Sequence, residues 1–154
     1  MAVHESLNEL MPWMLWSHPE YSVEESRTWL KEQVEAFKAQ SAFEFAITSD
    51  EGGYLGGVGL NQIDRPNRRA NLGYWVRTSA TSRGVCTSAV QQIRDWGFAN
   101  TDLIRLEILV ATGNVISQRV AEKAGALREG TLRKRLMLRD AVHDAVIFSL
   151  TRVG

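Results

Sequence analysis

The sequence lacks the features that define several common classes of protein. Cys86 is the only cysteine among 154 residues, which excludes an intramolecular disulfide and a cysteine-rich metal site. Lysine and arginine equal aspartate and glutamate at 18 each, so no overall basic field favours nucleic acid or an anionic membrane. No apolar run approaches the roughly 20 residues that span a bilayer, and an early glutamate interrupts the N-terminus, unlike a secretion signal. We therefore expect one cytoplasmic domain, residues 1–154, that binds neither nucleic acid nor membranes.

Common nucleotide and metal motifs are absent as well. No Gly-Lys-Ser/Thr follows a glycine-rich loop, and the Gly-x-Gly-x-x-Gly fingerprint of dinucleotide sites does not occur. The three histidines, His4, His18 and His143, show no spacing of metal ligands, so we predict that no metal is bound.

The hydrophobic pattern that is present changes its period along the chain. Ser22 and Glu25 fit a capping box before helix-spaced apolar residues, and a shorter helix precedes them near Pro12. Further helices are predicted over 85–99 and 114–124, and strands over 43–47, 54–63, 70–76, 103–110, 132–138 and 142–150. This order predicts an α/β (α+β) fold, a mixed sheet with helices packed on it. The crossover from 70–76 to 103–110 suits parallel neighbours.

The segment Thr81–Ala89 joins a predicted strand to a predicted helix. The first backbone N–H groups of a helix lack internal partners and carry partial positive charge, so a pyrophosphate can accept their hydrogen bonds. Gly84 allows a ligand to approach closely, and Arg83 offers a charged fork. The alternative is an ordinary helix start capped by Ser82 or Thr81.

Asn114 and Ser117 lie at a second strand-to-helix junction. Both side chains could point at a ligand that lies along the strand ends. The alternative is that Asn114 caps the helix and Ser117 bonds locally.

Taken together, these segments resemble the GNAT acetyltransferase superfamily, and within it the RimJ/RimL-like protein N-acetyltransferases. The resemblance runs from about Leu10 to Leu150. The matching segments occur in the order of the family: 10–13, 29–30, 56–60, 70–76, 83–85, 105–107, 114–117, 123–126 and 129–130.

The resemblance implies a site for acetyl-CoA. Backbone groups near Trp75, Val76 and Arg77 would hold the pantetheine arm. The pyrophosphate loop would comprise Ser82, Arg83, Gly84, Val85, Cys86 and Thr87. Two positions depart from the family pattern, because Thr81 replaces Gln or Arg and Cys86 replaces a small Gly or Ala.

The resemblance also implies catalytic roles. Asn114 would bond the pantetheine, and Ser117 would either protonate the leaving thiolate or only orient the cofactor. Glu44 is the first candidate for the base that takes the proton of the acceptor amine, with Glu107 and Glu129 as alternatives. A backbone N–H near Val76 would stabilise the oxyanion.

The expected activity is therefore direct acetyl transfer from acetyl-CoA to a primary amine, most simply a protein N-terminal α-amine such as that of a ribosomal protein. A small amine (an antibiotic or metabolite) is the alternative acceptor, and a non-catalytic acyl-CoA-binding module is the alternative class.

Relatives carry a strand before the segment that resembles residues 10–13, so the family's first strand is expected to be missing and to leave an exposed sheet edge. A truncated chain, a homodimer through that edge, or cover by the chain's own N-terminus would each account for this.

Overall fold

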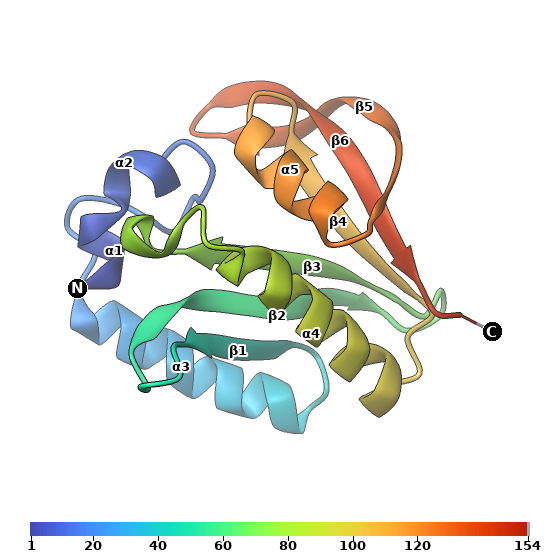
Figure 1. Ribbon diagram of the computed structural model, residues 1–154, viewed down its shortest axis with the longest axis horizontal. Helices are drawn as coiled ribbons and strands as arrows, with labels where there is room; N and C mark the ends of the chain where they lie inside the picture. The colour runs from blue at the N-terminus through green and yellow to red at the C-terminus, as the bar shows by residue number, and fades with distance from the viewer. Residues whose placement is uncertain (154) are drawn as a thin grey trace.

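The computed structural model describes residues 1–153, and its strands form one six-stranded sheet in the order β1-β2-β3-β4-β6-β5 (Figure 1). The neighbours β3 and β4 are parallel, and the other pairs are antiparallel. The predicted mixed sheet with flanking helices is therefore confirmed. The strands are β1 (Phe43–Thr48), β2 (Tyr54–Asp64), β3 (Arg69–Val76), β4 (Arg105–Ala111), β5 (Leu127–Leu138) and β6 (Ala141–Thr151). The helices are α1 (Ala2–Glu5), α2 (Leu7–Leu10), α3 (Val23–Lys38), α4 (Val85–Asn100) and α5 (Val115–Lys123), and a short 3-10 helix, η1 (Thr78–Ala80), follows β3.

The two faces of the sheet differ in polarity because side chains alternate along each strand. One face packs against α4, whose Gly97 lies so close to the sheet that a Cβ there would be 2.7 Å from Leu60 Cδ1. Leu60, Leu106 and Phe148 on this face are fully buried. The opposite face carries polar side chains along the same strands, among them Glu44 and Asn71. The apolar face thus forms the hydrophobic core, whereas the polar face does not.

Helix α3 begins where the sequence predicts. Ser22 Oγ accepts a hydrogen bond from the Glu25 backbone N–H at 3.2 Å, and Glu25 Oε2 accepts one from the Ser22 backbone N–H at 2.8 Å. The helix packs against β1, which lies at the edge of the sheet and within residues 1–153 pairs only with β2 (Figure 1). Pairing of this edge with a second copy of the chain stays a prediction.

Strand β5 is longer than predicted, since it begins at Leu127 and not at Leu132. Most of its side chains are exposed, including Arg128 and Glu129, so this edge strand lacks the apolar alternation that identifies a half-buried strand. Strand β4, which was expected from Leu103, begins at Arg105.

One side chain ties the N-terminal loop, residues 11–21, to the far end of the chain. Arg139 lies in the two-residue turn between β5 and β6, and its guanidinium donates hydrogen bonds to three backbone carbonyls of the loop. The Arg139 Nε donates to Met11 O at 2.6 Å, and its Nη2 donates to Met14 O and to Ser17 O. The planar fork of the guanidinium suits this arrangement better than an ammonium does.

We expect the substitution Arg139→Met to loosen the N-terminal loop. Hydrogen bonds from a charged donor each contribute roughly 1.5–3 kcal/mol, so chymotryptic cleavage at the loop's aromatic residues should accelerate by about tenfold or more. Limited proteolysis followed by mass spectrometry measures this rate. Arg139→Lys keeps the charge but not the fork and should give an intermediate rate; equal rates in all three proteins would contradict the anchoring role.

Candidate active site

The strands β3 and β4 pair over only a short stretch. Their register joins Arg69–Asn71 to Arg105–Glu107, and beyond these residues the two strands have no common ladder and diverge (Figure 1). On the side that faces β4, the backbone N–H and C=O groups of residues 72–76 therefore form no hydrogen bonds with another strand. A gap of this kind in a parallel pair exposes strand backbone to an extended ligand.

Helix α4 begins beside this gap with an N-terminus that no side chain caps. Its N-cap is Gly84, at φ 76°, and Ser82 two residues earlier is also left-handed at φ 60°. The alternative interpretation, in which Ser82 or Thr81 caps the helix, is therefore wrong. The first N–H groups of α4, those of Val85, Cys86 and Thr87, have no partner within the helix, which is the donor set that an anion requires.

Cys86 lies in the first turn of α4 and contributes its backbone N–H to that anion site. Its thiol is half-buried near the Tyr74 hydroxyl, and burial raises the pKa of the Cys86 thiol to about 12. The thiol therefore stays protonated at neutral pH and is not activated as a nucleophile.

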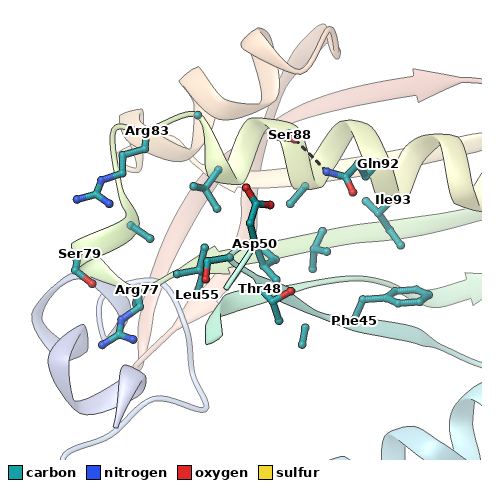
Figure 2. Close-up of a pocket in the computed structure, with 18 of the residues that line it drawn as sticks. Phe45, Thr48, Asp50, Leu55, Arg77, Ser79, Arg83, Ser88, Gln92 and Ile93 are labelled. Carbon is teal, nitrogen blue, oxygen red and sulfur yellow. Dashed lines mark hydrogen bonds between the residues drawn. The ribbon is translucent and has the colours of Figure 1, made fainter. Parts of the chain in front are cut away.

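A groove of about 890 Å³ lies between α4 and the strand β1 (Figure 2). Figure 2 shows Arg77 and Arg83 at one end of this groove and Phe45 at the other. Arg77 is already engaged, because its guanidinium pairs with Glu5 and its backbone N–H donates to Leu55 O at 2.7 Å. Trp75 and Val76, at the end of β3, are the other residues whose backbone groups the resemblance assigns to cofactor binding.

Asn114 and Ser117 meet at the start of α5. Asn114 Oδ1 accepts a hydrogen bond from the Ser117 backbone N–H at 3.2 Å, so Asn114 does cap the helix, and its amide nitrogen remains for a ligand. Ser117 Oγ donates to the Tyr74 hydroxyl at 3.0 Å, and that hydroxyl donates to Ser117 O at 2.9 Å. This pair bridges β3 and α5 across the gap between β3 and β4.

Tyr74 is a site residue that sequence reasoning missed. Burial raises the pKa of its hydroxyl, so the side chain is a neutral phenol that can donate and accept. Its position in the segment Gly73–Val76, which the resemblance singled out for backbone contacts, was the available signal.

Glu44 lies on the polar face of β1, on the far side of β2 from the gap. Its carboxylate rests directly on Gly59, where a Cβ would lie 1.9 Å from Glu44 Oε2, and it accepts a hydrogen bond from Asn61 Nδ2 at 2.9 Å. Burial raises the pKa of Glu44. A carboxylate with a raised pKa is a stronger base, which suits proton transfer near neutral pH.

The two alternative carboxylates are held in ion pairs. Glu107 accepts from Arg69 at 2.9 Å and from Arg105 at 2.8 Å. Glu129 faces the fork of Arg105, which lowers the pKa of Glu129 to about 2, and it also accepts from Ser149. The lowered pKa makes Glu129 a weaker base than Glu44, and the ion pairs of both carboxylates form a structural network with Arg69 and Arg105.

Comparison with known proteins identifies the family. A family model described as an acetyltransferase (GNAT) domain matches residues 2–127. The chain belongs to this family. Among curated GNAT relatives, the ribosomal N-acetyltransferase YdaF of Bacillus subtilis is 33% identical over 102 residues, which cover 66% of this chain and 56% of that protein. The ribosomal-protein-serine acetyltransferase of Escherichia coli is 28% identical over 95 residues, covering 62% and 53%. The chain thus spans about half the length of these relatives.

Two solved GNAT structures share the fold. The microcin C7 self-immunity acetyltransferase MccE, in complex with acetyl-CoA and AMP, superposes with a TM-score of 0.89 at 22% identity, covering 98% of this chain and 83% of that one. RimL, a ribosomal L7/L12 α-N-protein acetyltransferase in complex with coenzyme A, superposes with a TM-score of 0.89 at 21% identity, covering 97% of this chain and 84% of that one.

In the described part of the chain, no helix is both long and apolar enough to cross a membrane.

We expect Glu44→Gln to raise the melting temperature (Tm) at pH 7. The pKa of Glu44 in the folded state lies above its ordinary value of 4.5, so its contribution to stability is full below pH 4.5 and is lost as the pH rises through the raised pKa. A neutral amide avoids that loss and keeps the hydrogen bond from Asn61.

Thermal unfolding across pH checks this expectation. The Tm gained by Glu44→Gln should be present at pH 7, should shrink as the pH falls through the raised pKa, and should be absent below pH 4.5. Glu24→Gln, on the exposed surface of α3, is the matched control and should give no such trend. A lower Tm for Glu44→Gln at pH 7 would contradict the pKa assignment.

Proposed function

We propose that the protein is an acetyl-CoA-dependent N-acetyltransferase that transfers acetyl directly to a primary amine, and that the amine is a protein N-terminal α-amine. The observation that carries the proposal is the gap between β3 and β4 beside the uncapped N-terminus of α4. The names of the curated relatives, which include ribosomal-protein acetyltransferases, support the choice of acceptor.

The donor set fits acetyl-CoA, which supplies an activated acetyl thioester. The N-terminus of α4 with Arg83 would bind the pyrophosphate, since a helix N-terminus and an arginine both favour phosphate. The backbone of Trp75 and Val76 would bind the pantetheine along the free side of β3, and the Asn114 amide nitrogen would donate to it from α5.

Different residues near the gap would accept and donate the two protons that the reaction transfers. Glu44, whose carboxylate lies across β2 from the gap, would accept a proton from the acceptor ammonium. Ser117 would donate a proton to the leaving thiolate, and the Tyr74 hydroxyl would hold Ser117 in position. A backbone N–H near Val76 would stabilise the oxyanion, so positioning supplies much of the rate and no covalent enzyme intermediate is required.

We expect excess acetyl-CoA to raise the Tm of the protein. A ligand at 100 times its Kd that binds only the folded state adds about 2.7 kcal/mol, or roughly 5–10 °C for a chain of this size. Differential scanning fluorimetry measures the shift, with 3′-dephospho-CoA and AMP as controls. Absence of a shift at millimolar acetyl-CoA would overturn the cofactor assignment.

We expect Glu44→Gln and Ser117→Ala to lower kcat/KM by about 10²–10⁴-fold, the range for general acid–base groups. Glu24→Gln and Ser41→Ala, both exposed and remote from the gap, are the matched controls and should keep wild-type rates. Peptide amines and small amines are compared by release of coenzyme A. Binding of acetyl-CoA without turnover of any amine would favour a non-catalytic module, and turnover of small amines alone would favour the small-molecule alternative.

A further inference from the structure

Three side chains on the polar face form one hydrogen-bonded row across β3, β2 and β1. Asn71 Nδ2 donates to Asn61 Oδ1 at 2.9 Å, and Asn61 Nδ2 donates to Glu44 Oε1 at 2.9 Å. Because each bond uses a defined amide atom, the row fixes the orientation of the Asn61 side chain. It directs an amide N–H toward the carboxylate, and Glu44 is held as an acceptor.

Glycines make space beside this row. Gly59 and Gly73 are register partners on β2 and β3, and the carboxylate of Glu44 occupies the space over Gly59. The space over Gly73 is open: a methyl group there would meet no protein atom closer than Asn71 Nδ2 at 3.8 Å and Asn61 Nδ2 at 3.9 Å. The protein thus leaves an open floor at Gly73, bordered by two amide nitrogens and next to a carboxylate.

An aromatic wall bounds the floor on the side toward the ends of the strands. The Trp75 indole lies over Gly57, with Nε1 3.1 Å from the position of a Cβ there. Gly57 is two residues from Gly59, which places the indole about 7 Å along the strand from the carboxylate. Trp16 of the N-terminal loop and Tyr54 of β2 pack on Trp75, with ring centroids 5.4 and 6.0 Å away.

The donors and acceptors around the floor match a defined chemical group. The carboxylate of Glu44 is the partner of an ammonium. Each asparagine amide nitrogen carries two N–H groups, of which the row uses one, so a second remains for a carbonyl oxygen. An ammonium and a carbonyl separated by one carbon are the start of a peptide chain.

We propose that the Gly73 floor binds an α-amino acyl group, with its α-ammonium at Glu44 and its carbonyl oxygen at the free N–H groups of Asn61 and Asn71. This inference rests on the proposed N-acetyltransferase function and specifies the acceptor that this function uses. An amine without the neighbouring carbonyl leaves the two amide N–H groups unpaired, and a site built to bond a substrate group discriminates strongly against analogues that lack it.

Direct binding tests the proposal without turnover. Isothermal titration calorimetry compares a tetrapeptide amide that begins with alanine, its Nα-acetylated form and propylamine, each added to the protein with coenzyme A. The wild-type protein should bind the free peptide, and both other ligands should bind at least about tenfold more weakly, because one lacks the ammonium and the other the carbonyl.

Gly73→Ala is the informative variant, since its methyl group fills the floor and contacts no protein atom closer than 3.8 Å. It should weaken peptide binding by about tenfold or more while Tm and acetyl-CoA affinity stay at wild-type values. Gly53→Ala, in the turn between β1 and β2, is the matched control and should bind like wild type. Asn71→Leu, which removes one of the two free amide N–H groups, should reduce the preference for peptide over propylamine.

The binding results distinguish failure of the acyl-group site from failure of the proposed acetyltransferase function. Wild-type peptide affinity in Gly73→Ala, or propylamine bound as tightly as the peptide, would overturn the acyl-group site even if the enzyme acetylates amines. Peptide binding as described together with no binding of acetyl-CoA would support this site and would reject the proposed function alone.

Discussion

The short pairing of β3 with β4 is the constraint on which the rest of the site depends. Three register pairs hold the two strands together at one end, and α4, which connects them, spans from the open end back to the closed end (Figure 1). The same crossover therefore opens a gap in the sheet and places a helix N-terminus beside it. Neither feature requires an unusual residue, because both follow from the point at which the pairing of β3 with β4 ends.

The bridge between Tyr74 and Ser117 limits how far that gap can vary. Two hydrogen bonds connect β3 to α5 across residues that are 43 positions apart in the chain. Each contributes a modest free energy, but together they fix the serine hydroxyl relative to the backbone that would carry the thioester. The Tyr74 hydroxyl thus fixes the start of α5 relative to β3.

The local parts of this structure could be predicted from the sequence, whereas the parts set by strand register could not. The capping box of α3 and the cap at Asn114 involve neighbouring residues, and both form as the sequence indicates. The first part of β5 was missed because an exposed edge strand buries few side chains. The row from Asn71 to Glu44 was missed because it spans three strands, although Asn61 and Asn71 flank one hairpin turn and hairpin pairing would have placed them opposite each other.

The turn at Arg139 and Asp140 limits how the β5–β6 hairpin can be stabilised by substitution. Both residues adopt positive φ, at 46° and 65°, in a two-residue hairpin loop for which asparagine and glycine are the favoured residues. Arginine is a poor choice for the backbone there, yet its side chain holds the N-terminal loop. A consensus turn introduced by an engineer would strengthen the hairpin and free the loop in the same step. Local hairpin stability and long-range order thus compete for a single position, and this chain favours the long-range contact.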